Sequence, residues 1–97
     1  MSKITFEWDA SKASLNKKKR GISFDEAKTV FFDENAKVIH DPEHSDDGER
    51  FIILGSSVNV RMLVVIHCYR KNDCIIRLIS ARKATQKESM QYHGGHL

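Results

Sequence analysis

The sequence is poor in cysteine and proline, and it has no long hydrophobic run. Its two cysteines, Cys68 and Cys74, could face each other across a hairpin, but in a reducing compartment we expect two free thiols. The longest apolar run, residues 62–66, is far too short to span a bilayer. Residues 1–9 lack the apolar core of a signal peptide, so we expect a cytoplasmic protein without a membrane segment.

Common catalytic and metal-binding motifs are also missing. The five glycines form no phosphate-binding loop, and no Gly-x-Ser-x-Gly nucleophile motif occurs. His40 and His44 lie beside several acids, which leaves a weak metal site as the alternative to ordinary loop histidines. We therefore expect neither a metal nor a cofactor.

Charge is distributed unevenly along the chain, although the net charge is only +3. Residues 1–24 carry six Lys/Arg and two acids, and residues 50–97 carry eight Lys/Arg and two acids. Between them, residues 25–49 carry nine acids and two lysines. The two basic segments could bind nucleic-acid phosphates or an acidic protein partner, the alternative being a solvated surface without a partner.

Hydrophobic periodicity and capping residues predict one α+β domain spanning residues 1–97. Residues 4–8 alternate as a strand, and Asp9 and Gly21 are the expected caps of the helix between them. Ser23 is the expected N-cap of a second helix, and Thr85 begins a C-terminal helix. The other predicted strands are residues 36–40, 50–55, 60–69 and 74–81. This order predicts a small, largely antiparallel sheet with two N-terminal helices and a C-terminal helix.

The last predicted strand contains an arginine where an apolar residue is expected. Alternation places Ile76, Leu78 and Ser80 on the core face and Arg77 on the other face, between two isoleucines. A charge in that position needs either an ion-pair partner or a ligand of opposite charge. The open alternatives are phosphate binding and an ion pair with Asp9 or Glu7.

Arginines recur on the neighbouring strands, at Arg50, Arg61 and, just beyond the last strand, Arg82. Guanidinium groups suit phosphate oxygens, and adjacent antiparallel strands bring such side chains close together. His67 has the strand parity of Arg61, so it could transfer a proton on the same face, the alternative being a structural histidine.

Four segments resemble the BrnT family of bacterial type II toxins. They are "FEWDASK", "NKKKRGISFDEA", "DPEHSDDGERFIILG" and "RLISARKATQKESMQY", which together cover nearly all of residues 6–92. The last segment is the most specific. Arg20 stands where the family commonly has histidine.

The resemblance implies a RelE-like fold and a ribonuclease that arrests translation and growth. It also implies a cognate antitoxin, BrnA, whose DNA-binding part lets the complex repress its own operon. The implied reaction is metal-independent cleavage of RNA, in which the ribose 2′-hydroxyl attacks the adjacent 3′-phosphate. The protein must then supply a proton acceptor, a proton donor and charge stabilisation.

We expect Arg77 and Arg82 to form a clamp for phosphate charge, with Arg50 or Arg61 in support. The candidate proton-transfer groups are Tyr92 and His67, followed by His44. The expected RNA- or antitoxin-binding residues are Lys12, Lys19, Arg20, Arg61 and Lys83. The aromatic side chains of Trp8, Phe24 and Phe31 are expected in the core.

Two other functions are compatible with the sequence. The first is a catalytically inactive module derived from such a toxin, which binds RNA or a partner. The second is a DNA-binding regulator, which ranks last because no helix-turn-helix coincides with the basic segments. For an active toxin, we expect the antitoxin to cover the sheet face that carries the arginines.

Overall fold

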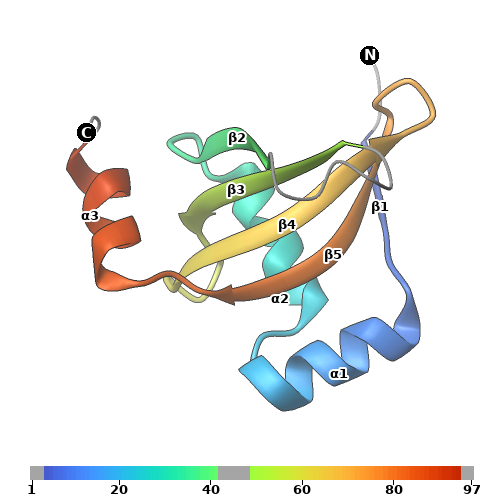
Figure 1. Cartoon of the computed structure of the whole chain (residues 1–97), viewed down its shortest axis with the longest axis horizontal. Coiled ribbons are helices and arrows are strands. Elements are labelled where there is room, and N and C mark those ends of the chain that lie inside the picture. The colour runs from blue at the N-terminus through green and yellow to red at the C-terminus, as the bar shows by residue number, and fades with distance from the viewer. Residues whose placement is uncertain (1–3, 42–48, 95–97) are drawn as a thin grey trace.

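The computed structural model describes residues 4–41 and 49–94, which form a five-stranded sheet and its helices (Figure 1). The elements are β1 (Thr5–Glu7), α1 (Ala10–Arg20), α2 (Phe24–Ala27), the 3-10 helix η1 (Lys28–Phe32), β2 (Lys37–Asp41), β3 (Arg50–Ser56), β4 (Met62–Arg70), β5 (Ile75–Lys83) and α3 (Gln86–Gly94). The predicted α+β class is confirmed. Among the described helices, none is long and apolar enough to cross a membrane.

The helix ends form at the residues that the sequence indicates. The Asp9 carboxylate accepts a hydrogen bond from the Lys12 backbone N–H at 3.0 Å, and Gly21 ends α1 with a φ of 73°. Thr85 Oγ1 accepts from the Glu88 N–H at 3.1 Å, while Glu88 Oε1 accepts from the Thr85 N–H at 2.8 Å. These bonds join residues three positions apart, so they depend little on the rest of the fold.

The sheet has the strand order β1-β5-β4-β3-β2 and is mixed. Strands β2 to β5 pair antiparallel, whereas β1 pairs in parallel with β5, which the sequence pattern does not indicate. Cys68 lies opposite Arg77 rather than Cys74, and both cysteines are free.

A β-bulge in β5 changes which residues face the core. His67 pairs with Leu78 but Ile66 pairs with Ser80, so Ile79 is the additional residue. The prediction that Ser80 lies on the core face is therefore wrong. Ala81 takes the core position, with 1% of its surface exposed.

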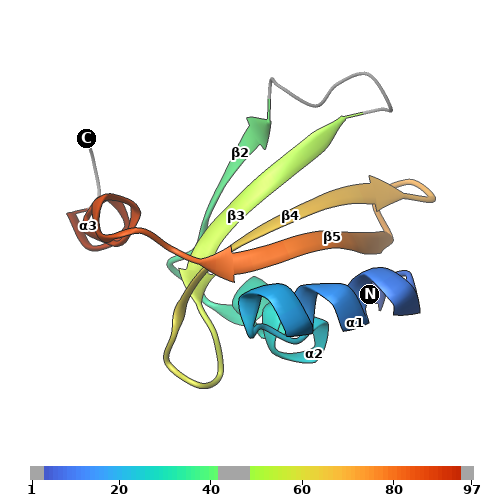
Figure 2. The same cartoon turned by 60° about the horizontal axis from the view of Figure 1, so that its bottom comes forward.

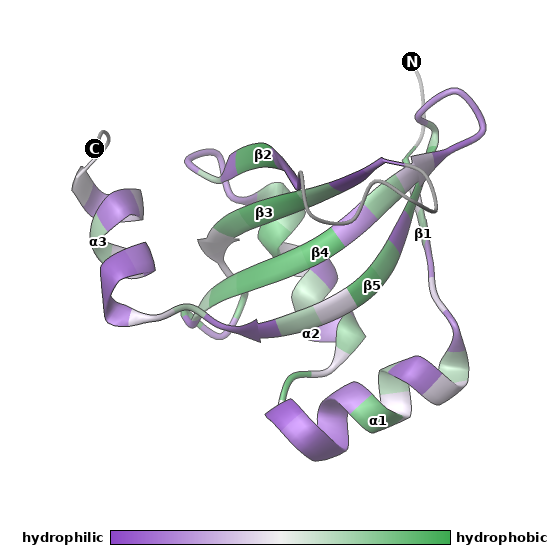
Figure 3. Ribbon diagram, in the orientation of Figure 1, coloured by the Kyte–Doolittle hydropathy of each residue, from purple (hydrophilic) through white to green (hydrophobic). Residues whose placement is uncertain are grey.

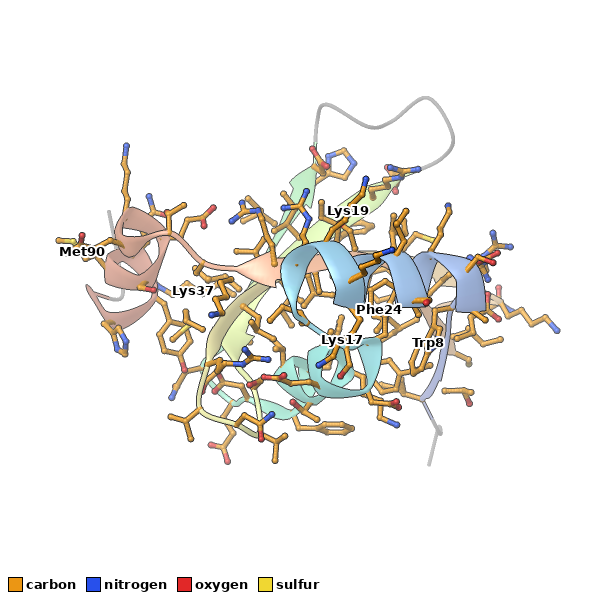
Figure 4. All side chains as sticks on the ribbon, turned by 90° about the horizontal axis from the view of Figure 1, so that it is seen from below. Trp8, Lys17, Lys19, Phe24, Lys37 and Met90 are labelled. Atoms are coloured by element: carbon orange, nitrogen blue, oxygen red, sulfur yellow. The ribbon has the colours of Figure 1, made fainter. Side chains whose placement is uncertain are left out.

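The core lies between the sheet and the layer formed by α1, α2 and η1 (Figure 2). Phe24 is buried as predicted, and its ring meets the ring of Trp8 edge-on at 5.8 Å between centroids (Figure 4). Phe31 and Trp8 are partly buried against the same cluster, also as predicted. Among the described residues, no helix covers the other face of the sheet, and α3 lies beyond one end of the sheet (Figure 2).

Candidate functional site

The open face of the sheet, opposite α1 and α2, carries three rows of side chains. Strand register gives a middle row and two outer rows, each crossing the sheet. The middle row is Ile39, Ile52, Ile66 and Ser80; one outer row is Lys37, Leu54, Val64 and Arg82; the other is Asp41, Arg50, Cys68, Arg77 and Glu7. Hydrophobic colour runs along β3 and β4, and the end of β5 is hydrophilic (Figure 3). The face therefore has an apolar centre with arginines on both sides.

Arg77 lies in the outer row beside β1, where it forms an ion pair. Its Nη1 donates to Glu7 Oε2 at 2.8 Å, and Arg70 Nε approaches the same oxygen at 3.6 Å. The parallel β1–β5 register places Glu7 directly opposite Arg77. The ion-pair alternative is thus realised, with Glu7 rather than Asp9 as the partner. Arg50, at the other side of this row, lies opposite Asp41.

Arg82 occupies the opposite outer row, next to α3. Its two terminal nitrogens donate to the two carboxylate oxygens of Glu88, both at 2.9 Å. The Arg82 hydrogen bonds lower the pKa of Glu88 to about 2, against the opposing effect of burial. Glu88 is therefore ionised at neutral pH and holds the guanidinium group in one orientation.

A pocket of about 230 Å³ opens between this row and α3. Its walls are formed by Lys37, Ile39, Ile52, Leu54, Val64, Arg82, Glu88 and Gln91. Four of these eight side chains are apolar, and the cations among the other four are Lys37 and Arg82. Arg82 thus lies where an anionic group resting on the open face would meet it.

Polar contacts attach α3 to the other described parts of the molecule. Besides the Arg82–Glu88 pair, Lys37 Nζ donates to the Gln91 carbonyl at 2.9 Å, and the Tyr92 hydroxyl donates to Asp33 Oδ2 at 2.7 Å. The hydrogen bond to Asp33 raises the pKa of Tyr92. No residue of α3 is buried, so the helix is positioned by polar contacts rather than by an apolar face.

Arg77 and Arg82 share a face but do not meet. The bulge at Ile79 makes this possible, because without it two residues five positions apart would point to opposite faces. Five residues of strand extend roughly 16 Å, and each guanidinium group binds a different carboxylate. The two arginines therefore do not form the single clamp expected from the sequence.

His67 lies on the helix-covered face with none of its surface exposed. Its Nδ1 lies 3.3 Å from the Val65 carbonyl, to which it can donate, and Nε2 lies 3.2 Å from the Tyr69 hydroxyl. Burial lowers the pKa of His67 to about 4. In this position the ring is a structural element of the core, and a ligand on the open face would not reach it.

Arg61 also lies away from the open face. Its Nε donates to Glu26 Oε2 at 2.9 Å, and its Nη2 donates to Glu26 Oε1. The Arg61 hydrogen bonds and that from the Ser57 hydroxyl lower the pKa of the buried Glu26 to about 2, although burial alone would raise it. This contact gives Arg61 a structural role that strand parity alone did not indicate.

The remaining predicted residues lie on exposed surfaces or outside the described residues. Lys12, Lys19 and Arg20 are exposed on α1, and Lys83 is exposed at the end of β5. His44, a predicted proton-transfer group, lies outside the described residues. Within residues 4–41 and 49–94, no group of three or more His, Cys, Asp or Glu side chains is placed to hold a metal ion.

The sequence indicated only some of the contacts that the predicted site residues make. Glu88 carries a local signal, because it is the third residue after Thr85 in the capping box. Asp33 carries no such signal, since its contact with Tyr92 joins residues 59 positions apart. Glu7 could be proposed as a partner for Arg77, but only strand register decides between Glu7 and Asp9.

Comparisons with known proteins agree on one family. Residues 8–88 match the family model described as the ribonuclease toxin BrnT of a type II toxin–antitoxin system. The crystal structure of the ribonuclease toxin BrnT from Brucella abortus is similar, with a TM-score of 0.63 and 26% sequence identity. The match covers 89% of this chain and 100% of that chain. No curated protein matches the chain.

Proposed function

Since this chain belongs to the BrnT family of ribonuclease toxins of type II toxin–antitoxin systems, we propose that it is a metal-independent endoribonuclease. It cleaves single-stranded RNA in the cytoplasm and thereby blocks translation and growth. The observation that carries the assignment of the site is the position of Arg82. Its side chain lines a pocket at the open face, and its guanidinium group is held in a bidentate contact that a phosphate can also make.

The proposed reaction uses the RNA's own nucleophile. The 2′-oxygen forms a bond to the adjacent phosphorus as the bond to the 5′-oxygen breaks, which leaves a 2′,3′-cyclic phosphate and a 5′-hydroxyl. The 2′-hydroxyl gives its proton to solvent water, and one proton is delivered to the 5′-oxygen. Arg82 stabilises the charge on the crowded phosphate, and Tyr92 on α3 delivers the proton to the 5′-oxygen.

The carboxylate that binds Arg82 also has a role in the proposed reaction. Glu88 and the RNA phosphate compete for Arg82, so the ion pair keeps the guanidinium group ordered until RNA takes over the contact. Arg77 lies too far along β5 to share the same phosphate. It contacts a neighbouring phosphate, with Arg50 in support, on the other side of the apolar row.

The antitoxin expected for a type II system is proposed to be a BrnA-like protein, whose DNA-binding part lets the complex repress its own operon. We propose that it neutralises the toxin by covering the open face. An apolar centre with a charged rim is the usual composition of a stable protein interface, and Ile39 at the edge of this centre is 61% exposed. A complex that leaves Arg77 and Arg82 open to solvent would contradict this.

The decisive experiment is cleavage of single-stranded RNA by the purified protein in EDTA. We expect cleavage by the parent and by Arg70→Ala, whose guanidinium group lies at an exposed strand end, and a loss of at least a hundredfold in Arg82→Ala. Circular dichroism checks that each variant is folded. Equal cleavage by the parent and Arg82→Ala would remove Arg82 from the site.

A second candidate function is an inactive binding module derived from such a toxin. It is favoured by the carboxylate partners that occupy Arg61, Arg77 and Arg82. Binding of RNA by the folded parent without cleavage, in EDTA and in magnesium, would support this function. A neighbouring reading frame for a short antitoxin would instead favour the active toxin.

A further inference from the structure

A groove of about 180 Å³ runs between α1 and β5, at the side of the open face. Three cations from α1, Lys12, Lys19 and Arg20, line it together with the side chains of Asn16 and Ser80. The groove is separate from the pocket beside α3, and the two share no lining residue.

The cations of this groove differ from Arg61, Arg77 and Arg82 in having no carboxylate partner. Arg61, Arg77 and Arg82 each pair with a glutamate. In contrast, Lys12, Lys19 and Arg20 form no ion pair within residues 4–41 and 49–94, and α1 itself contains no acid. Three cations without a carboxylate partner therefore lie together at this groove, where their positive potential can act on one phosphate-bearing strand.

Helix stability explains only some of these cations. Lysine and arginine near the end of α1 are favoured there by the negative end of the helix dipole. Lys12, however, lies in the first turn, where the dipole disfavours a positive charge. Its spacing from Asn16 and Lys19 is four and then three residues, which places all three on one side of the helix.

The floor of the groove is rigidly held. The Asn16 side chain binds the backbone N–H and carbonyl of Ala81, and it also donates to the Ile22 carbonyl at 2.9 Å. The bulge at Ile79 turns Ser80 away from the core, so that its side chain lines the groove. Ser80 and Arg82 are on the same face, two residues or about 7 Å apart. The groove therefore leads towards the proposed site at Arg82.

We propose that this groove binds backbone phosphates of the single-stranded RNA whose cleaved bond lies at Arg82. The inference rests on the proposed ribonuclease function, and it identifies where the strand is held outside the reacting nucleotides. Lys12, Lys19 and Arg20 contact phosphate oxygens, and the Ser80 hydroxyl donates to one of them. Such contacts fix the strand without reading its bases, so the groove contributes affinity rather than sequence preference.

The same helix supplies a matched control. Lys17 and Lys19 point to opposite sides of α1 (Figure 4), and Lys17 and Lys18 do not line the groove. The variants Lys12→Ala/Lys19→Ala and Lys17→Ala/Lys18→Ala lose the same charge from exposed positions of one helix. Only the first pair lines the groove.

The test is fluorescence anisotropy with a labelled 2′-O-methyl RNA strand, which cannot be cleaved, at several salt concentrations. We expect the groove variant to lose about tenfold in affinity. The slope of log K against log salt should fall by roughly 1.4, at about 0.7 for each phosphate contact removed. The control variant should lose less than threefold and keep the parental slope.

Equal losses in the two variants, or an unchanged affinity in the groove variant, would overturn the proposal. Loss of antitoxin binding without loss of RNA binding would overturn it in favour of a protein partner. Because the probe cannot be cleaved, the result does not depend on catalysis. A parent that binds this probe but cleaves no RNA would refute the ribonuclease function and leave the groove standing.

Discussion

The side-chain amide of Asn16 takes the place of a neighbouring strand for Ala81. Its Nδ2 donates to the Ala81 carbonyl at 3.0 Å, and its Oδ1 accepts from the Ala81 N–H at 3.1 Å. β1 pairs with β5 only at residues 75–77, so the edge of β5 beyond them has no strand partner there. Asn16 supplies hydrogen-bond partners for the Ala81 backbone at this edge, and it thereby fixes α1 against the sheet.

Asn16→Ala should therefore destabilise the protein by about 2–4 kcal/mol, because it removes the side chain that binds three buried backbone groups, the Ala81 N–H and carbonyl and the Ile22 carbonyl. Urea unfolding followed by circular dichroism measures the change. Lys18→Ala, at an exposed position of the same helix, is the control and should stay within about 0.5 kcal/mol of the parent. An equally small effect of Asn16→Ala would contradict the role of the amide.

The Glu26–Arg61 pair should make stability depend on pH in acid. The pKa of Glu26 is about 2 in the folded protein and near 4.5 in the unfolded chain, so folding favours the ionised form. Its contribution to the free energy of unfolding is present above pH 4.5 and is lost as the pH falls towards 2.

Unfolding measured at several pH values for the parent and Glu26→Gln checks this. The stability difference between the two proteins should be constant above about pH 5 and should shrink below it. A stability difference that does not change between pH 5 and pH 2.5 would show that the contact with Arg61 does not lower the pKa of Glu26.

His67 should act on stability and not on catalysis. Its pKa of about 4 in the folded protein lies below the ordinary 6.5, so the unfolded chain takes up a proton first. The neutral ring's contribution to the free energy of unfolding is fully present above pH 6.5 and is lost as the pH falls from 6.5 to 4. His67→Phe should reduce this loss and cleave RNA at a rate within about threefold of the parent, since the ring is buried.

Proton NMR of the parent should show the His67 imidazole titrating near pH 4. If His67→Phe remains folded but cleaves RNA a hundredfold more slowly than the parent, the histidine belongs to the site after all.

Tyr92→Phe should slow single-turnover cleavage by about a hundredfold, because it removes the proposed proton donor. The parental rate should also fall at alkaline pH as the hydroxyl ionises, and the hydrogen bond to Asp33 moves this fall above the ordinary pKa of tyrosine. Asp33→Asn is the companion variant, because it keeps the Tyr92 hydroxyl but weakens its anchor.

If the hydroxyl only positions α3, Tyr92→Phe and Asp33→Asn should have equal effects and leave the shape of the pH profile unchanged. That result would leave the ribonuclease in need of a different proton donor.

The sequence by itself determined the local features of this protein. Asp9, Ser23 and Thr85 cap their helices through bonds to residues three positions away, and a short peptide already contains both partners. Alternation likewise predicted the burial of Ile76 and Leu78. The family was recognisable because residues 77–92 keep these local signals and the arginines together.

Only the tertiary structure decided how the arginines are used. One additional residue at the bulge reverses the alternation of β5, which moves Ser80 off the core face and brings Arg82 to the face of Arg77. The partners Glu7 and Asp33 lie 70 and 59 positions from Arg77 and Tyr92, so strand register and packing choose them. His67 became a core residue for the same reason, since parity groups side chains by face but does not say which face the helices cover.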